Sequence, residues 1–542
     1  MKDTPMFAGR SRTARISALL TTAAAMAAGL LTATAAHAVV GDQAQDGAYP
    51  FLVKLDITMG DAKRACTGTL VDPRWVLTAA SCFADTPGAA VPAGAPKGKA
   101  TATVGRSDLS NTSAGAVRDI VELVPRTDRD LVMVRLASAV SGVTPASVTT
   151  SAPTEGESLQ SAGFGRTRDE WVPDHAHTAA FTAGTLTGTS VQLAASGDAA
   201  ICKGDTGGPV LSTTGGHTAI VGVSSLSWQG GCLGTDPAET RTGASAARVD
   251  DLAGWVKQVA YGPAFAGAPW DHAVQMTAGY YTGGSAGGTR HMDLIVVWDD
   301  GEVTLYQGGE GNDPAHPFSA EYQLAPRKSI WIKALSVTSV NTGGGTDGVV
   351  VRWIDGEMTL YTTVDAKGFH GEKQLAPAKN ETWRDDAFQL VGGRFTAGGH
   401  RDDLLVDWKD GHVSVFNDVA VNGLKKQTQV VAKNTTWPHA TQLTSGSFTG
   451  KTTDDLLVRW SDGETTIYPG MNGKSLPGEL KIRPARPDKS NWADATVVAA
   501  GAFTANTTAD DIIVRWSDGH VSLFPGVDAK GLHDEFRLAP AN

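Results

Sequence analysis

Short apolar runs, separated by clusters of Gly, Pro, Ser and Asp, dominate the first half of the chain. Examples are TGTLV at 67–71, WVLTA at 75–79, DLVMVRL at 130–136 and TAIVGVSSL at 218–226. Runs of this length bounded by turn residues are typical of β-strands. The pattern predicts an all-β domain, either a barrel pair or a sandwich.

One segment of this half has helical spacing instead. In RVDDLAGWVKQVA at 248–260, Leu252, Trp255, Val256 and Val259 recur at helical intervals, and Asp250 or Asp251 can cap the start. We expect a helix that closes the first domain. The Gly, Pro and Ala content that follows predicts a short linker over residues 262–269.

Beyond the linker one unit occurs five times. Its copies are DLIVVWDDGEVTLY, GVVVRWIDGEMTLY, DLLVDWKDGHVSVF, DLLVRWSDGETTIY and DIIVRWSDGHVSLF, and they contain Trp298, Trp353, Trp408, Trp460 and Trp516. The copies are 52 to 56 residues apart, a period typical of propeller blades. Each has an alternating strand, an Asp-Gly type hairpin and further strands, enough for a four-stranded blade. Residues 270–542 are therefore predicted to form a five-bladed β-propeller.

A second tryptophan series keeps nearly the same step: Trp270, Trp331, Trp383, Trp437 and Trp492. Large rings repeated once per blade fill the wedge between neighbouring sheets, which is the simpler interpretation. The alternative is that some rings are exposed platforms for sugars, whose repetition would supply avidity.

The first residues indicate export. Lys2, Arg10, Arg12 and Arg15 precede an apolar run that ends in AHA at Ala38, the layout of a secretory signal peptide over residues 1–38. The mature chain then begins at Val39. No later stretch has about 18 uninterrupted apolar residues, so we expect a secreted protein without a membrane anchor. The formal net charge of −11, with no basic run, argues against a nucleic-acid partner.

Four cysteines, Cys66, Cys82, Cys202 and Cys232, all lie in the first half. An even number in an exported chain favours disulfides over metal ligands, and no CxxC pair suggests zinc. Three pairings are open. Joining Cys66 to Cys82 and Cys202 to Cys232 would close two short loops, each worth a few kcal/mol.

Three segments carry a resemblance to a known family: ACTGTLVDPRWVLTAASC at 65–82, DRDLVMVRL at 128–136 and ICKGDTGGPVL at 201–211. With VVGD at 39–42, SAGFGRT at 161–167 and SWQGGC at 227–232, they occur in the order found in trypsin-like serine peptidases. Residues 39–261 resemble that family, which implies a double β-barrel with a C-terminal helix. The family also places two disulfides where these cysteines stand.

The resemblance implies a catalytic triad at three positions, which here hold Ser81, Asp130 and Thr206. The family has histidine and serine at the first and last of these. Its mechanism needs a base that titrates near neutral pH, and a serine hydroxyl cannot serve. The mature chain has no histidine before His175, and His175 and His177 are expected in a solvated loop.

Other family features are kept. The amides of Gly204 and Thr206 are predicted to form the oxyanion hole, because backbone donors do not depend on the missing side chains. The resemblance implies that a new N-terminal ammonium at Val39 pairs with Asp205. In the specificity pocket, Ala200 stands where a base-recognising aspartate would sit. The pocket wall is assigned to Ser227, Trp228 and Gln229. Because the aspartate is missing, cleavage after Lys or Arg is disfavoured.

The repeats resemble FG-GAP and VCBS-type propellers, which implies a glycan, cell-wall or protein ligand. Members of that group often carry a calcium loop before the first alternating strand. Here the carboxylate pairs Asp454–Asp455 and Asp510–Asp511 are too few for a six-oxygen cage, so no metal and no other cofactor is expected.

Two hypotheses follow. The first is a pseudoprotease whose barrels hold a peptide or protein ligand while the propeller attaches the protein to a glycan, wall or partner. The second is a weak hydrolase in which Thr206 is the nucleophile, assisted by water or by Asp130 through Ser81, with the oxyanion hole supplying most of the rate.

Overall fold

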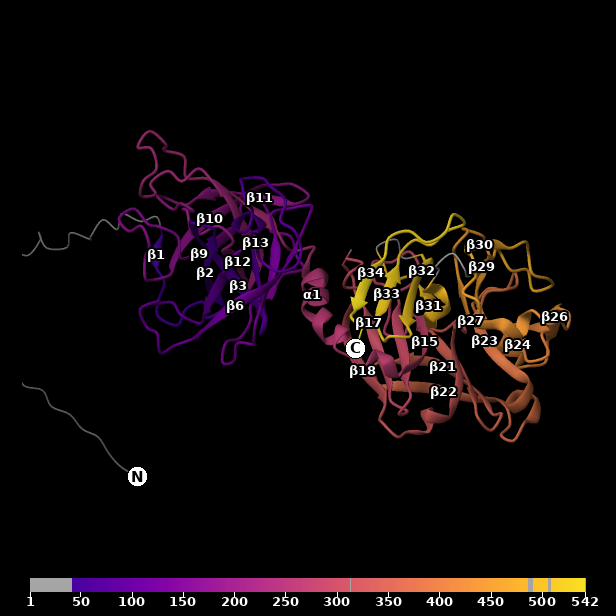
Figure 1. Ribbon diagram of the computed structural model, residues 1–542. Coiled ribbons are helices and arrows are strands. Elements are labelled where there is room, and N and C mark those ends of the chain that lie inside the picture. Colours follow the sequence, from indigo (N-terminus) through magenta and orange to yellow (C-terminus); the bar gives the residue numbers. More distant parts are fainter. Residues whose placement is uncertain (1–40, 312, 486–490, 505–507, 542) are drawn as a thin grey trace, which may run out of the picture.

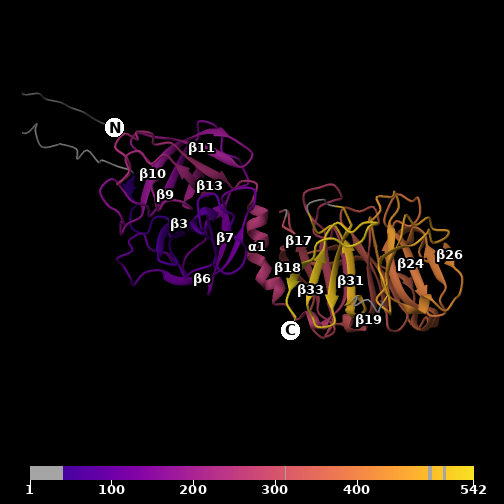
Figure 2. The ribbon, with the colours of Figure 1, turned by 45° about the horizontal axis from the view of Figure 1, so that its top comes forward.

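The computed structural model describes residues 41–311, 313–485, 491–504 and 508–541, without the side chain of Asn491. The predicted signal peptide and Val39 lie outside the described residues. Figures 1 and 2 show two β-rich bodies with one helix, α1 (Ala253–Ala266), between them in both views.

The first body begins with a closed six-stranded barrel in the order β2-β3-β4-β7-β6-β5. Its strands are β2 (Leu52–Met59), β3 (Ala62–Asp72), β4 (Trp75–Thr78), β5 (Ala100–Val104), β6 (Ala116–Pro125) and β7 (Val132–Leu136). Inward positions alternate along β5, where Ala100, Ala102 and Val104 are buried. These small residues leave room for larger ones such as Leu55, Leu70 and Trp75 in the same core.

A second barrel is packed beside the first. Its strands are β9 (Ser158–Gly163), β10 (His177–Leu186), β11 (Ser190–Ala195), β12 (Pro209–Thr214), β13 (His217–Ser227) and β14 (Ala244–Arg248), and pairing of β9 with β10 closes the ring. The short strands β1 (Asp42–Gln43) and β8 (Ser147–Val148) pair with β10 and β13. The double β-barrel with a C-terminal helix is thus confirmed.

Both disulfides occur as the resemblance implied. Cys66 is joined to Cys82 and Cys202 to Cys232, with Cα–Cα distances of 6.3 and 5.8 Å. The first ties β3 to the short helix η1 (Ala80–Cys82), and the second ties the loop before β12 to the loop after β13. Both bonds therefore hold loops that carry predicted site residues.

Helix α1 differs from the sequence-based expectation at both ends. Leu252 is its N-cap and makes no side-chain capping bond, whereas Asp250 and Asp251 pair with Arg248 and Arg129. At the other end the helix continues through Pro263 to Ala266, so it includes the first five residues of the expected linker. Phe265 explains the extension, since it is 3% exposed and packs into the core of the second body.

The second body is a five-bladed propeller. Blade 1 has β15 (Ala273–Gly279), β16 (Asp293–Trp298), β17 (Val303–Gly308) and β18 (Phe318–Ala325). Blade 2 has β19 (Ala334–Val340), β20 (Gly348–Trp353), β21 (Met358–Asp365) and β22 (Gly368–Ala376). Blade 3 has β23 (Ala387–Gly393), β24 (Asp403–Trp408), β25 (Val413–Phe416) and β26 (Gln427–Val431). Blade 4 has β27 (Ala440–Gly446), β28 (Asp455–Trp460), β29 (Thr465–Tyr468) and β30 (Leu480–Arg483). Blade 5 has β31 (Ala495–Gly501), β32 (Asp511–Trp516), β33 (Val521–Phe524) and β34 (Phe536–Ala539).

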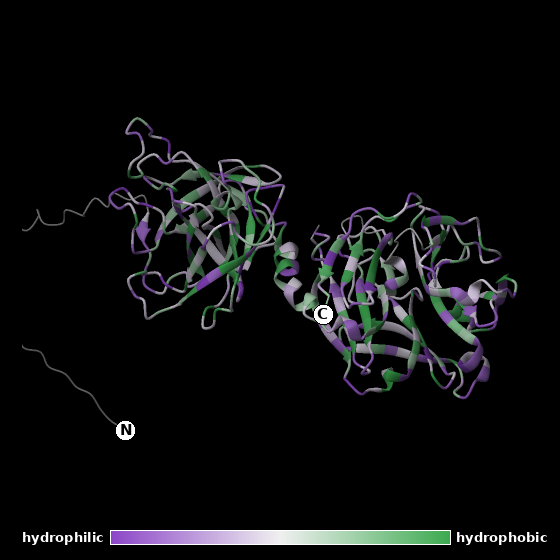
Figure 3. Cartoon of the chain, in the orientation of Figure 1, coloured by the Kyte–Doolittle hydropathy of each residue, from purple (hydrophilic) through white to green (hydrophobic). Residues whose placement is uncertain are grey.

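Short helices precede the blades: η2 (Trp270–His272), η3 (Ile330–Lys333), η4 (Thr382–Asp386), η5 (Trp437–His439) and η6 (Asn491–Asp494). A further short helix, α2 (Val419–Asn422), follows β25. The ring closes without a strand from elsewhere, because the Met292 amide donates to Ala502 O at 2.7 Å and Arg515 Nε donates to Trp270 O at 2.9 Å. Figure 3 shows apolar residues concentrated in the blade strands and polar ones in the loops.

Both tryptophan series lie in the propeller core. The ten rings are between 1% and 8% exposed, and each ring of the first series lies 5.2 to 5.5 Å from one of the second, between centroids. The wedge-filling interpretation is confirmed. Rings this deeply buried offer no face to a sugar, so the alternative interpretation is wrong for both series.

Candidate functional site

The loops that carry Ser81 and Asp130 leave the first barrel side by side. Ser81 lies on η1 after β4, Asp130 lies before β7, and the two strands pair with Thr78 opposite Val132. The Ser81 amide donates to Asp130 Oδ1 at 2.7 Å, and the Ser81 hydroxyl donates to Asp130 Oδ2 at 2.9 Å. Ser81 therefore binds the carboxylate through both of its donors.

Sequence reasoning missed a third donor. Ser225, in β13 of the second barrel, donates its hydroxyl to Asp130 Oδ2 at 2.6 Å. Nothing in the run TAIVGVSSL distinguishes Ser225 from Ser224, whose hydroxyl instead lies 3.4 Å from that of Ser161. The Asp130 carboxylate therefore accepts hydrogen bonds from both barrels. Such bonds are stronger than those between neutral groups when the acceptor is ionised.

Thr206 lies in the loop before β12, and that loop is fixed to the first barrel. The Thr67 amide donates to Thr206 O at 2.9 Å, and the Thr67 hydroxyl donates to Gly204 O at 2.8 Å. Within the described chain, the Thr206 hydroxyl makes no hydrogen bond. The loop thus keeps its position while the side chain that would be the nucleophile has no base beside it.

His175 and His177 of the first domain lie elsewhere. His175 Nε2 is 4.0 Å from Asp108 Oδ1, and His177 starts β10, where it pairs with Gln43. Burial lowers the pKa of His177, so its ring is neutral at pH 7. Neither ring hydrogen-bonds to Thr206 in the described part of the chain, and no other imidazole there does.

The backbone of the 202–208 loop has three amides without an acceptor among the described residues, those of Lys203, Gly204 and Thr206. Asp205 N donates to Cys202 O at 3.0 Å, Gly207 N to Ser224 O at 2.7 Å and Gly208 N to Asp205 O at 2.8 Å. Among described residues, the amides of Gly204 and Thr206 donate to no acceptor. Gly204 has a backbone φ of +106°, which residues with a Cβ atom rarely adopt. The predicted oxyanion donors are therefore available to an incoming carbonyl oxygen.

Asp205 is enclosed although part of the residue is exposed. Its carboxylate accepts from Gly165 N at 2.7 Å and from Cys202 N at 2.9 Å. A Cβ at Gly163 or Gly165 would collide with this carboxyl group, so glycine is needed at both positions. Burial raises the pKa of Asp205 to about 6, and no cation pairs with it within the described residues. Its predicted partner, the ammonium of Val39, lies outside them.

The residues predicted to form the specificity pocket differ in exposure. Ala200 and the neighbouring Ile201 are 3% and 4% exposed, and the Ser227 hydroxyl donates to Ile201 O. Trp228 is 55% exposed, with the Arg241 guanidinium 3.5 Å from its ring centroid. Gln229 has φ of +62° in the turn that follows. No carboxylate lies among the predicted pocket residues to pair with a basic side chain.

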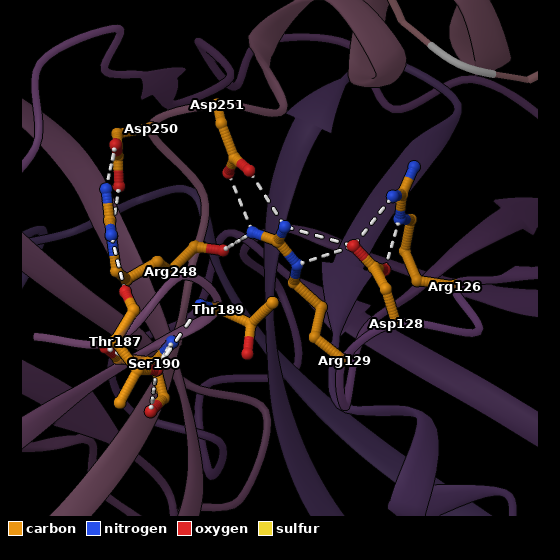
Figure 4. A network of polar contacts seen from close by, with 9 residues as sticks. All are labelled: Arg126, Asp128, Arg129, Thr187, Thr189, Ser190, Arg248, Asp250 and Asp251. Atoms are coloured by element: carbon orange, nitrogen blue, oxygen red, sulfur yellow. Dashed lines mark hydrogen bonds and ion pairs between the residues drawn. The ribbon is translucent and has the colours of Figure 1, made fainter.

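A charged network next to Asp130 joins the first barrel to the start of α1 (Figure 4). The Arg129 side chain is 6% exposed and donates to Asp251 at 2.7 and 2.8 Å, to Arg248 O at 2.9 Å and to Asp128. Arg248 in turn pairs with Asp250 at 2.6 Å. Because Arg129 directly precedes Asp130, the network fixes the backbone that positions the carboxylate.

Several acidic residues of the propeller, among them Asp454, Asp455 and Asp511, are bound by protein donors. Asp455 accepts from Thr449 N at 2.7 Å and from Gly470 N, and Asp454 accepts from Arg401 Nε at 2.9 Å. Asp511 accepts from Phe503 N and Gly526 N. These carboxylates join loops of one blade or of neighbouring blades. Three further carboxylates, Asp402, Asp403 and Asp418, lie close together, and Asp403 accepts four bonds from Phe395, Thr396 and Asp418.

The propeller has a hollow that suits a polar ligand. It measures about 540 Å³ and lies where the inner strands end, and it is lined among others by Tyr280, Asn341, Arg394, His400 and Arg401. The Arg401 side chain also lines the central channel below it. Polar groups from neighbouring blades therefore converge on one mouth of the channel.

Comparison with known proteins gives two findings. Residues 38–256 match the sequence model of the family described as Trypsin. A 46-residue stretch is 46% identical to a protein named Collagenase from Hypoderma lineatum, and that stretch is 8% of this chain and 18% of the relative. The alignment thus spans under a fifth of the collagenase. Helices in the described chain are all too short or too polar to cross a membrane.

Proposed function

We propose that this chain, which carries a trypsin-like serine peptidase family domain followed by a five-bladed propeller, is a secreted pseudoprotease that binds peptides. The observation that carries the proposal is the contact of Ser81 with Asp130. In a working enzyme of this kind the carboxylate orients an imidazole, and the imidazole takes the proton of the nucleophile. Here a serine takes the place of the imidazole.

The hydrogen bonds of Asp130 support dormancy. Ser81 N, Ser81 Oγ and Ser225 Oγ donate to its two oxygens at 2.6 to 2.9 Å, so the carboxylate is satisfied without a base. A serine hydroxyl does not take up a proton near neutral pH, so the Thr206 hydroxyl stays protonated. Loss of triad members lowers turnover by roughly 10⁴ to 10⁶, and the remainder comes from the oxyanion hole.

Two features support peptide binding. The free amides of Gly204 and Thr206 suit a carbonyl oxygen, and the small residue Ala200 at the predicted specificity position suits a small or apolar side chain. Removal of a signal peptide over residues 1–38 would place an ammonium at Val39. That charge would compensate the buried carboxylate of Asp205 and order the loop.

For the propeller we propose attachment to a glycan, a cell wall or a protein. The polar residues at the channel mouth near Arg401 favour a polar ligand at that place. The tryptophan rings are buried, so a sugar cannot stack on them. The FG-GAP or VCBS assignment of the repeats remains part of this proposal. A glycan array probed with mature chain, with Arg401→Ala as the variant, tests it.

A second candidate is a weak hydrolase with Thr206 as nucleophile. It is favoured by the unbonded Thr206 hydroxyl beside two free amides. The methyl group of Thr206 would crowd the reacting carbonyl, and no base would take the proton of the hydroxyl, so the rate of hydrolysis would be low.

The deciding experiment uses the mature chain, residues 39–542, with casein and peptide esters as substrates. We expect peptide binding without hydrolysis, and no change in Thr206→Ala. Turnover that disappears in Thr206→Ala would instead establish the hydrolase. The combined variant Ser81→His with Thr206→Ser should restore hydrolysis if the loop geometry is intact, and Ser81→His alone is its matched control.

A further inference from the structure

One end of the propeller exposes a group of large apolar side chains. This end is where the inner strands begin, opposite the channel mouth described above. The group, here named the apolar end face, comprises Val274, Ile330, Ile332, Leu335, Ile354 and Phe388, which are between 37% and 63% exposed. All six belong to blades 1 to 3, and four of them belong to blade 2.

The repeats provide an internal control for these positions. The second residue of the inner strand is Val274, Leu335 and Phe388 in blades 1 to 3, but Thr441 and Thr496 in blades 4 and 5. The two threonine hydroxyls donate to Arg459 O and Arg515 O at 2.9 and 2.8 Å. A blade therefore folds equally with a polar residue at this position, so the fold does not require the apolar residues.

The hairpin position gives the same result. The residue after the strand-ending tryptophan is Ile354 in blade 2, but Ser461 and Ser517 in blades 4 and 5. Ile354 is 52% exposed, so its side chain contributes little to the core. Both comparisons indicate that this surface is apolar for a reason other than folding.

Hydrogen bonds join the segments that carry the apolar end face within blade 2 and between blades 2 and 3. Ile354 N donates to Lys333 O at 2.9 Å, next to Ile332, and Arg352 Nη2 donates to Phe388 O at 3.1 Å. Ile332 also packs against Gly301 of blade 1. Six half-exposed side chains of this size present on the order of 500 Å² of apolar surface, at the upper end of what a monomer exposes in one patch.

The charges around the apolar end face have both signs. Lys328 and Lys333 are exposed, as are Asp355 and Asp386, and none of the four forms an ion pair in the described chain. Acidic groups beside the patch and a net charge of −11 oppose docking on an anionic membrane. Five of the six side chains are aliphatic and provide no flat ring on which a sugar could stack, and Phe388 is the least exposed of the six. A two-fold axis, in contrast, can place lysines of one copy opposite aspartates of the other.

We propose that the apolar end face is an isologous interface between two copies of this chain. Its apolar centre together with the charged rim approaches the roughly 800 Å² per partner of a standard interface. The proposal does not depend on whether the barrels bind or cut peptides. A dimer would present two channel mouths and two barrel pairs, which raises avidity for a multivalent surface.

Sedimentation velocity over a concentration series of the mature chain tests the proposal. We expect the sedimentation coefficient to rise to that of a dimer across the micromolar range. The variant Leu335→Lys with Ile354→Lys should weaken association at least tenfold. The matched control, Thr441→Lys with Ser461→Lys, alters the equivalent positions of blade 4 and should leave association unchanged. Thermal melts of both variants establish that they remain folded.

A charge exchange adds a readout that only a self-interface gives. Lys333→Glu and Asp355→Lys should each weaken self-association, and an equimolar mixture of the two variants should restore it. A wild-type chain that stays monomeric at all concentrations overturns the proposal, as does equal weakening by the blade 2 and blade 4 variants. Binding of the monomer to phosphatidylglycerol vesicles through the same residues would overturn it in favour of a lipid surface.

Discussion

Asp407 lies fully buried in β24, at the seam between blades 3 and 4. The equivalent residues Arg352 and Arg515 donate to backbone carbonyls of the next blade. An aspartate cannot donate in this way unless it is protonated. In the described chain neither carboxylate oxygen of Asp407 has a well-aligned hydrogen-bond partner, and burial raises its pKa to about 8.

We predict that Asp407→Asn stabilises the propeller at pH 8. The folded pKa lies above the unfolded value, so the folded state binds more protons between about pH 4 and pH 8, and stability falls as pH rises through that window. The amide cannot ionise, so the gain should amount to several kcal/mol at pH 8, shrink as the pH falls, and vanish only near pH 4. Thermal melts across this range measure it. The exposed Asp534→Asn is the control, and a gain independent of pH would contradict the prediction.

Ser81, Asp130 and Thr206 could be proposed as site residues from the sequence, because each stands inside a motif with fixed neighbours. Ser225 has no such frame, and its role depends on a contact between two barrels that are distant in sequence. The repeats mark Asp407 as a departure, because Arg352, Arg459 and Arg515 stand at the same position in other blades, but the surroundings of its carboxylate come from another element. A single residue can therefore be predicted where a motif surrounds it, but not where its partner comes from another element.

At the scale of elements, we expect the stability of the 202–208 loop to depend on a positive charge beside Asp205. Its Asp205 carboxylate fits between Gly163 and Gly165, and no described cation compensates it. In a chain that keeps its first 38 residues Val39 has no free ammonium, so we expect the Asp205 carboxylate to stay without a charged partner there. In that chain stability falls as pH rises from about 4 through the raised pKa of about 6.

The effect of Asp205→Asn is predicted to change sign on processing. In the unprocessed chain the substitution should be neutral or stabilising at pH 7, because it removes an unpaired charge. In the mature chain it should cost about 3 to 5 kcal/mol, because it leaves the Val39 ammonium unpaired. Urea unfolding of both forms, with the exposed Asp198→Asn as control, measures the difference. Equal losses in the two forms would exclude pairing with Val39.

Element boundaries were predictable only where local chemistry sets them. The five repeats gave the blades their period and their hairpins, because Asp-Gly turns and alternating residues act locally. The end of α1 did not follow this logic. Gly262 and Pro263 favour a linker by composition, yet the helix continues because Phe265 finds an aromatic pocket in blade 1.

For the whole molecule, α1 belongs to two cores at once. Trp255 and Val259 pack in the first barrel, while Phe265 packs with Trp270, Tyr306 and Phe318 at ring distances of 4.7 to 5.0 Å. Between these ends Gln258 is fully buried. It donates to His316 O at 2.8 Å and accepts from Gly311 N at 2.6 Å. The barrel pair and the propeller are therefore joined by packing as well as by the chain.

This shared helix predicts that the mature chain unfolds in one calorimetric transition. Phe265→Ala removes the ring that fills the pocket of blade 1, a loss of about 3 to 5 kcal/mol for a buried phenylalanine. We expect it to lower the propeller transition and separate it from that of the barrels. Val259→Ala, on the side of α1 that faces the barrel, is the matched control and should lower the barrel transition instead. The contrary result is two transitions in the unmodified chain whose separation does not change in Phe265→Ala. It would show that α1 packs against the propeller without coupling the two domains. If α1 does couple them, weakening its contact with one core must alter how the other core unfolds.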